Sequence, residues 1–187
     1  MPTTLFITQT EIAKYTPMGG NVDTDKYIYL VKDSQIMHVE PVLGTKLYNK
    51  LQTDFTDGTI TGIYNTIVED YIKPILIHMV FAEFVAIGAY RVQNGGLFKH
   101  LPEDGESMSL SEIESLEKNQ RAKASFYIDR LLTFLCDQDG NIPEYTYAQD
   151  NDYDQKPNQS NNYYGGWFLG QERVDNWMID ENNHNND

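Results

Sequence analysis

The chain has 187 residues, with 14 Lys and Arg against 28 Asp and Glu, and a formal charge of −14 at pH 7. It has no cluster of basic residues, and phosphate neutralisation supplies most of the affinity of proteins that read DNA or RNA, so sequence-specific nucleic-acid binding is excluded. A single cysteine, Cys136, excludes an intrachain disulfide, and the N-terminus lacks the pattern of a secretory signal peptide.

The first predicted elements are two short helices separated by a turn. Thr8 and Glu11 have the spacing of a capping box, in which each side chain bonds the backbone amide of the other, and predict a helix over about residues 9–14. Asp23 or Thr24 can begin the next helix. Its apolar residues recur with a broadly helical period, and we expect them to face the core: Tyr27, Ile28, Val31, Ile36, Met37 and Val39.

Two further helices are predicted before the centre of the chain. Gly44 or Thr45 begins one of them, whose apolar face comprises Leu47, Tyr48, Leu51 and Phe55. A loop over residues 57–62 leads to the other, from about Ile63. Pro74 either kinks this helix or restarts it, because proline lacks the amide hydrogen and clashes with the preceding turn.

The stretch Ile75–Val92 is apolar almost all round, which is typical of the central helix of a bundle. Its most apolar part, up to Tyr90, spans roughly 24 Å as a helix, whereas a bilayer core is roughly 30 Å thick, so a buried helix is predicted. Residues 94–96, Asn-Gly-Gly, end it. Residues 97–108 are expected to be a loop, with a short hairpin or added strand as an alternative there or at 142–149.

A long last helix is predicted from Ser109, which forms a second capping box with Glu112, to about Cys136. Gly140 is placed to end it in the left-handed conformation. Its apolar residues fall roughly on one side: Leu110, Ile113, Leu116, Ala124, Tyr127, Ile128, Leu131 and Leu135. The sequence thus predicts a mainly α fold, a small helical bundle of about five helices over residues 1–140.

Residues 141–187 form the second expected unit, a long extended C-terminal arm that is acidic and rich in asparagine. From Asp137 onward the chain has eleven acidic and two basic residues, which carry −9 of the net charge. Alone in water such a segment buries too little apolar surface to offset its ordering entropy, so we expect other subunits or proteins to hold it. Aromatic residues dominate interface hot spots, and the predicted partner-binding anchors are Tyr163, Tyr164, Trp167, Phe168, Leu169, Val174, Trp177 and Met178.

His78 and Glu83 are the polar residues of the apolar central helix. Being five positions apart, they point roughly 140° apart around the helix axis and do not form one site by themselves. They are either an acid/base pair completed by other residues, or a core histidine and a carboxylate each paired with a neighbouring helix or subunit. The second interpretation is favoured, because buried ionisable residues are often simply paired. No catalytic, cofactor-binding or metal-binding residue is predicted, and no enzyme.

Other chemical motifs fail on spacing. Alternating aspartates from Asp137 and from Asp150 lack the glycine and glutamate that a calcium loop requires at its sixth and twelfth positions. No histidines stand in zinc-ligand spacing with Cys136. Cys136 itself is expected to pack in the core, because the C-terminal end of a helix raises a thiol pKa and so disfavours a reactive thiolate.

Two motifs in the first third of the chain carry a family resemblance: Phe6-Ile7-Thr8…Glu11-Ile12…Tyr15-Thr16-Pro17…Gly20-Asn21-Val22-Asp23, and Val42-Leu43-Gly44-Thr45-Lys46-Leu47-Tyr48-Asn49-Lys50-Leu51. With them, roughly residues 5–135 resemble the head–tail connector or adaptor proteins of tailed bacteriophages, the portal-proximal ring proteins of crAss-like phages. The resemblance implies a structural virion protein at the head–tail junction, assembled in the host cytoplasm. It implies a twelve-fold ring of copies of the chain that contacts the portal protein and further tail or ring proteins. It implies no cofactor, no membrane contact and no catalytic residues.

An acidic ring agrees with passage of DNA, because no cationic contacts hold the phosphates, and we expect Glu103, Asp104 and Glu106 on an exposed loop. The alternative function is that of an acidic DNA mimic that inhibits a host nucleic-acid-binding protein. The net charge favours this alternative, but the charge is concentrated in a polar, aromatic arm, whereas a mimic needs carboxylates at rigid, phosphate-like spacing. A third hypothesis, a small enzyme that uses His78 and Glu83, predicts that alanine at either position abolishes activity without loss of folding.

Overall fold

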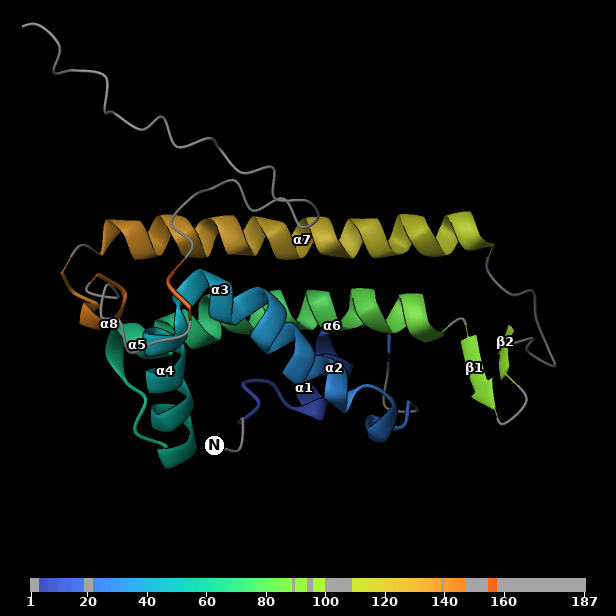
Figure 1. The fold of residues 1–187 in the computed structure, drawn as a ribbon, viewed down its shortest axis with the longest axis horizontal. Coiled ribbons are helices and arrows are strands. Elements are labelled where there is room, and N and C mark those ends of the chain that lie inside the picture. The colour runs from blue at the N-terminus through green and yellow to red at the C-terminus, as the bar shows by residue number, and fades with distance from the viewer. Residues whose placement is uncertain are drawn as a thin grey trace, which may run out of the picture.

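The structure is a computed structural model and describes residues 4–18, 22–88, 90–93, 96–99, 109–138, 140–146 and 155–157. This part of the chain is mainly α-helical and forms a small bundle, as the sequence predicts (Figure 1). The predicted anchors of the arm and the acidic loop at residues 103–106 lie outside the described residues, and their roles stay predictions.

The helices of the first third are α1 (Gln9–Tyr15), the 3-10 turn η1 (Thr24–Lys26), α2 (Ile28–Ser34), the π turn η2 (Gln35–Val39), α3 (Glu40–Leu43) and α4 (Thr45–Asp57). The remaining elements are α5 (Gly62–Thr66), the π turn η3 (Ile67–Ile72), α6 (Lys73–Gly88), β1 (Tyr90–Gln93), β2 (Gly96–Lys99), α7 (Leu110–Asp137) and α8 (Pro143–Thr146). Both predicted capping boxes are present, at Thr8 with Glu11 and at Ser109 with Glu112.

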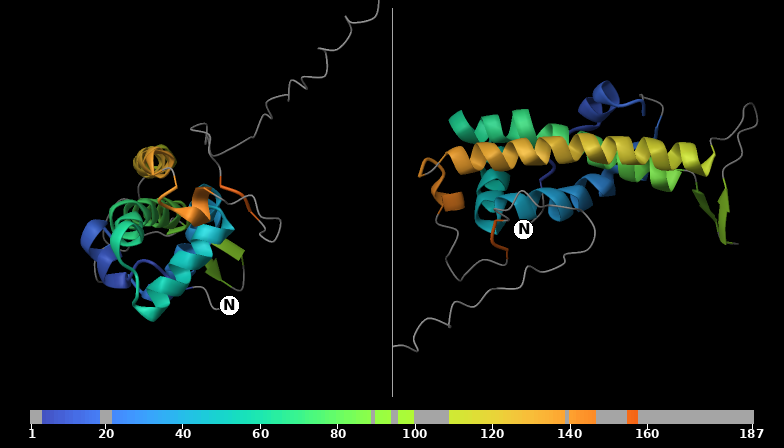
Figure 2. Two further views of the ribbon diagram at one scale, coloured as in Figure 1. Left: turned by 90° about the vertical axis from the view of Figure 1, so that its left-hand side faces the viewer. Right: turned by 90° about the horizontal axis from the view of Figure 1, so that it is seen from above.

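The centre of the bundle is the helical run α5–η3–α6, which other helices cover on several sides. Viewed end-on, α7 lies along this run, α1 covers another side, and α2, α3 and α4 cover a third (Figure 2). The facing residues of α6 and α7 are fully or almost fully buried, among them Leu76, Val80, Ala124, Ile128 and Leu131. None of the described helices is long and apolar enough to cross a membrane.

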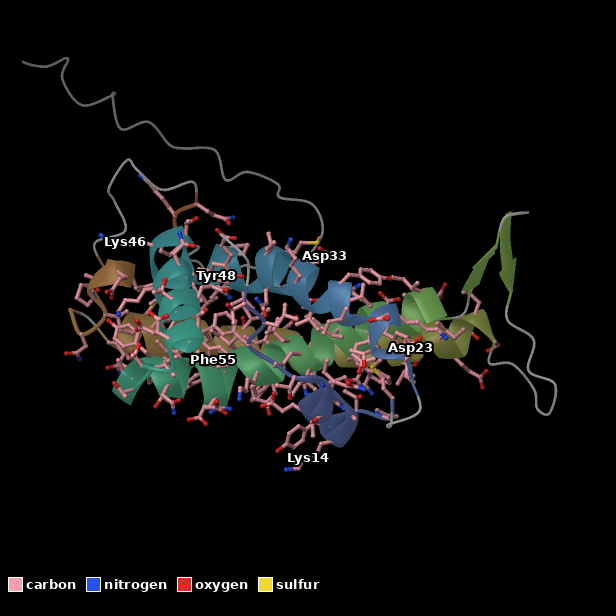
Figure 3. The ribbon with its side chains drawn as sticks, turned by 90° about the horizontal axis from the view of Figure 1, so that it is seen from below. Lys14, Asp23, Asp33, Lys46, Tyr48 and Phe55 are labelled. Carbon is pink, nitrogen blue, oxygen red and sulfur yellow. The ribbon has the colours of Figure 1, made fainter. Side chains whose placement is uncertain are left out.

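The N-terminal segment packs against α4. The ring of Phe6 meets the rings of Tyr48 and Phe55 edge to face, with centroid distances of 6.0 and 5.4 Å. Figure 3 shows both of these residues on α4, beside the segment that leads to α1. Gln35, which is fully buried in η2, accepts the Phe6 N–H at 2.8 Å and donates to the Thr4 carbonyl oxygen at 3.0 Å. A buried amide side chain therefore ties the first described residues to η2.

A π turn precedes each proline that lies inside a helical run. In η2 the Glu40 N–H bonds to the Gln35 carbonyl just before Pro41, and in η3 the Lys73 N–H bonds to the Val68 carbonyl just before Pro74. Proline cannot donate a backbone hydrogen bond, and its ring needs room beside the preceding turn. A π turn is wider than an α turn, so the residue before the proline bonds to the carbonyl five positions back. The helix is consequently not broken at Pro74 and continues from α5 into α6.

The predicted apolar face of the second helical run is wrong at two positions. Ile36 and Met37, which were expected to face the core, are 41% and 59% exposed, whereas Ser34 and Gln35 are buried. Ser34 and Gln35 stand seven and eight positions after Tyr27, on the same side of a regular helix, whereas Ile36 lies on the side opposite Tyr27. The prediction followed the apolar character of Ile36 and Met37 instead of the helical period.

Three further predictions are wrong. The central helix ends at Gly88 instead of Val92, and residues 90–93 pair with residues 96–99 as antiparallel strands, which agrees in part with the alternative of a strand after residue 97. Residues 143–146 are the helix α8, not a strand. Leu110 and Cys136 were expected to pack, but Leu110 is 59% exposed and Cys136 is exposed too, because each lies at an end of α7. Gly140 has the predicted left-handed conformation, with φ of 76°.

The helical body continues past residue 140. Ile142 and Tyr145 are buried in the same core as α7. The hydroxyl of Tyr64 donates to Glu144 at 2.7 Å, and burial together with this bond raises the pKa of Tyr64 to about 12. Residues 141–146, expected to begin the arm, thus pack as part of the body.

Residues 155–157, which we call the strap, lie on the junction of α3 and α4. The Thr45 N–H donates to the Gln155 carbonyl oxygen at 2.9 Å, and the Gln155 N–H donates to Thr45 Oγ1 at 3.0 Å. Pro157 lies against Gly44, whose φ of 74° and ψ of 152° belong to a region that is essentially restricted to glycine. The strap fixes the point from which the rest of the arm starts.

Candidate functional site

The two polar residues of the central helix are each paired with a different helix. The Nδ1–H of His78 donates to Gln120 Oε1 of α7 at 2.9 Å. Glu83 accepts from Ser34 Oγ at 3.2 Å and lies 3.3 Å from His38 Nε2. The favoured interpretation, paired ionisable residues that do not form one site, is confirmed for both.

The group of Ser34, His38 and Glu83 has residue types that also occur in hydrolases, but not their geometry. A nucleophilic serine needs its hydroxyl beside the imidazole that takes its proton. Here the hydroxyl and the imidazole bond to different oxygens of the same carboxylate, so the group fastens α2 and η2 to α6. Among the residues that the structure describes, no group of His, Cys, Asp and Glu could hold a metal ion.

A shallow groove lies where α7 meets η3 and α6. Three adjoining hollows form it, of about 370, 500 and 340 Å³, and neighbouring hollows share Phe126, Tyr127 or His78. We call this feature the aromatic groove and define it by Tyr71, His78, Phe126, Tyr127, Arg130 and Phe134. At its far end the groove is bordered by Tyr15 and Glu11 of α1.

The helical period aligns the α7 residues of the aromatic groove. Phe126, Arg130 and Phe134 follow one another at four-residue spacing, which places them on one side of a helix. Across the groove, Tyr71 stacks on Phe134 with ring centroids 5.0 Å apart, and His78 stacks on Tyr127 at 5.9 Å. Phe126 remains 59% exposed. A large aromatic side chain is thus open to solvent beside the ring of Tyr127.

Arg130 lies at the middle of this row. Its guanidinium carbon lies 5.4 Å from the ring centroid of Tyr71, 5.9 Å from that of Phe126 and 5.7 Å from that of Tyr127. Within the described part of the chain Arg130 forms no ion pair. Guanidinium has five N–H donors, suited to bidentate binding of a carboxylate, and cation–π contacts do not use them. The groove therefore presents a cationic donor among apolar rings.

The electrostatics differ at the α1 end. Lys73 Nζ lies 2.8 Å from Glu11 Oε1 and 2.7 Å from Glu69 Oε1. Burial acts to raise the pKa of Glu11, but the hydrogen bonds from Lys73 and Thr8 outweigh it and hold the pKa below its ordinary value. Burial lowers the pKa of His78 despite its bond to Gln120, so the imidazole is neutral at pH 7. The hollow around Arg130 is also lined by Asp129 and Asp137, so the groove has carboxylates at both ends.

The Lys73 bridge predicts a pH dependence of stability. A carboxyl whose folded pKa lies below its unfolded value stabilises the fold above the unfolded pKa, and this contribution is lost as the pH falls through the folded pKa. Glu11 therefore contributes above about pH 4.5 and loses this contribution below it. We expect Lys73→Met to reduce the loss of unfolding free energy between pH 5 and pH 3, measured by urea unfolding. Lys118→Met, at an exposed position of α7, is the control, and an equal slope in both variants would contradict the prediction.

Sequence reasoning missed most of this groove. It placed Tyr127 on the core side of α7 and discussed His78, but it did not single out Phe126, Arg130 or Phe134. The available signal was the four-residue spacing of two rings around an arginine. That spacing gains meaning only when Tyr71 is known to lie opposite, which depends on the packing of η3 against α7.

Comparison with protein families matches a sequence pattern to residues 39–155. This range begins at the end of η2, includes every residue that defines the aromatic groove, and ends within the strap. No curated protein and no solved structure matches the chain. Because the pattern covers more than half of the 187 residues, the chain belongs to DUF6712, a family of unknown function.

Proposed function

We propose that the chain is a structural virion protein that forms a ring at the head–tail junction of a tailed bacteriophage. In this proposal the ring binds the portal protein and further tail or ring proteins, and it surrounds the channel through which DNA passes. The resemblance of roughly residues 5–135 to connector proteins supports this function. The charge of −14 supports it as well, since an acidic wall does not trap phosphates.

One structural observation supports the proposal most. The strap and α1 lie on opposite sides of the α5–η3–α6 run (Figure 2), and α1 borders one end of the aromatic groove. A subunit with two unlike contact regions on opposite sides associates head to tail, and a rotation that closes gives a ring. The arm anchors predicted from the sequence then bind neighbouring subunits or the portal, and the resemblance sets the expected ring at twelve copies.

The proposal is tested with the purified full chain by sedimentation velocity over a concentration series, followed by negative-stain microscopy. We expect one discrete oligomer that grows with concentration and has a central opening, and no retention of duplex DNA on a filter. A monomer at every concentration would contradict ring formation. Tight binding to a DNA-binding protein that duplex DNA displaces would instead support the DNA-mimic alternative.

A further inference from the structure

We infer that residues 163–169 of the arm dock on the outer face of α2 and η2 of their own chain. We call these residues the proximal cluster, and we call the surface that Tyr29, Ile36 and Met37 define the α2–η2 face. This inference concerns the single chain and goes beyond the proposed ring, on which it does not depend. In the ring it leaves the anchors beyond residue 169 to neighbouring subunits or the portal.

The α2–η2 face is an exposed apolar surface that begins beside the strap. Tyr29 is 47% exposed and Ile36 is 41% exposed. Exposed apolar side chains that gather on one face mark interaction sites on proteins. Both residues belong to a row with three- or four-residue spacing, which lies on one side of a helical run: Tyr29, Asp33, Ile36, Glu40 and Gly44. The row ends at the glycine that the strap covers.

The strap leads the chain toward this face. Gln155 bonds to Thr45 through both its N–H and its carbonyl oxygen, and two residues later the ring of Pro157 lies against Gly44. The chain therefore runs from α4 toward α3, antiparallel to the helical run that it covers. Continued in the same direction, it follows the row from Gly44 toward Tyr29.

The position of the strap also distinguishes this face from other exposed apolar residues. Figure 3 shows Lys46 of α4 and Asp33 of the row along the same edge of the body. Tyr15 is exposed as well, but it lies on α1, on the opposite side of the central run (Figure 2). Ile87 and Leu110 lie where α6 ends and α7 begins, at the end of the bundle away from α4 (Figure 1).

The length of the chain after the strap fits this face. Tyr163 is six residues beyond Pro157 and lies at most roughly 20 Å from it, and Leu169 at most roughly 40 Å. Along the helical run Ile36 is roughly 12 Å from Gly44, and Tyr29 is roughly 22 Å from it. A linker of this length holds the cluster beside the face at an effective concentration on the order of millimolar. Docking on the same chain is therefore favoured over docking on another copy in dilute solution.

The composition of the arm separates the proximal cluster from the part that follows. Residues 158–171 contain no Asp, Glu, Lys or Arg, whereas residues 172–187 contain five acidic residues and Arg173. Within the uncharged part, the cluster contributes two tyrosines, a tryptophan, a phenylalanine and a leucine. Aromatic rings bury a large area and pack well on methionine and aliphatic side chains. The proximal cluster is thus suited to an apolar face, and the distal part of the arm keeps the charge.

Trp177→Phe leaves Trp167 as the single tryptophan of the full chain, so its emission reports on the proximal cluster. We expect emission at shorter wavelength than that of free tryptophan and weak quenching by acrylamide, because docking removes the indole from water. Both properties should stay unchanged on dilution, since the cluster and the face belong to one chain. Adding Ile36→Ser or Tyr29→Ser should shift the emission toward that of free tryptophan and increase quenching.

Two exposed residues outside the face provide matched controls. Ile87→Ser matches Ile36→Ser, and Tyr15→Ser matches Tyr29→Ser, because each pair has the same side chain and all four residues are exposed. Neither control should change the emission or the quenching. Far-UV circular dichroism should show the same helicity in all four variants, which separates loss of docking from loss of the fold.

Three outcomes overturn the inference. The first is emission of free tryptophan in Trp177→Phe, and the second is a shift to shorter wavelength that appears only as concentration rises, which would assign the cluster to a second copy. The third is an equal response of the face variants and their controls. Sedimentation velocity of the same samples separates this failure from failure of the proposed function. Oligomers without face-dependent emission refute the docking alone, whereas a monomer with face-dependent emission refutes the ring alone.

Discussion

Replacing Gln35 with leucine is expected to lower the free energy of unfolding by about 3 kcal/mol, because it leaves the buried Phe6 N–H without a partner at about 1–3 kcal/mol and removes two further hydrogen bonds at about 1 kcal/mol each. The Gln35 amide accepts the Phe6 N–H and donates to the Thr4 carbonyl oxygen and to the Tyr48 hydroxyl. Leucine fills a similar volume, so the loss reports on hydrogen bonds more than on a cavity. Urea unfolding followed by far-UV circular dichroism measures it.

Gln52→Leu is the control for this change. Gln52 also bonds to Thr4, through both its amide oxygen and its amide nitrogen, but it is only partly buried, so water can replace it. We expect a loss of about 1 kcal/mol, the usual net contribution of a hydrogen bond. Equal losses in the two variants would show that burial of the Gln35 side chain does not decide its contribution.

Gly44→Ala is expected to lower the free energy of unfolding by about 3 kcal/mol, the upper end of the cost of a strained backbone conformation. Two effects add at this position. The φ of 74° with ψ of 152° is unfavourable for any residue with a Cβ atom, and that atom would lie 2.6 Å from Cδ and 2.8 Å from Cγ of Pro157. The proline ring cannot bend aside, so the strap has to move.

Gly58→Ala separates these two effects. Gly58 also has a positive φ, of 67°, but nothing lies within 4 Å of a Cβ built on it. We expect it to lose about 1 kcal/mol, the cost of the left-handed conformation for alanine. Hydrogen exchange at the Thr45 amide, which bonds to the Gln155 carbonyl, should accelerate in Gly44→Ala and not in Gly58→Ala. Unchanged exchange in Gly44→Ala would mean that the strap is not held by its fit against residue 44.

The sequence predicts the parts of the fold that local chemistry decides. The capping boxes at Thr8 and Ser109 follow from side chains that bond amides three residues away, and both are present. The left-handed Gly140 likewise follows from the lack of a Cβ atom. Such features need no knowledge of the rest of the chain.

Other features have a local signal in the sequence, but the secondary structure assigned to them was wrong or incomplete. Asn94-Gly95 between two short runs is a strong hairpin signal, yet the apolar run before it was extended as helix to Val92. Pro41 and Pro74 indicated irregular helix, but not that a π turn would precede each of them. That choice depends on packing, since η3 is held by both α6 and α7.

The aromatic groove and the strap depend on contacts between residues far apart in the sequence. Tyr71 and Phe134 are 63 positions apart, and Thr45 and Gln155 are 110 apart. No local pattern connects either pair. Composition marked the arm as a segment for binding, but it gave no indication that residues 155–157 pack on the start of α4.

The strap also determines where mechanical force enters the molecule. A pull on the chain beyond Pro157 acts first on the two hydrogen bonds between Gln155 and Thr45, because they lie between the arm and α8. The force then passes into the start of α4, and it does not act on the packing of α8 or on the end of α7. The central helices consequently carry no tension until these two bonds have separated.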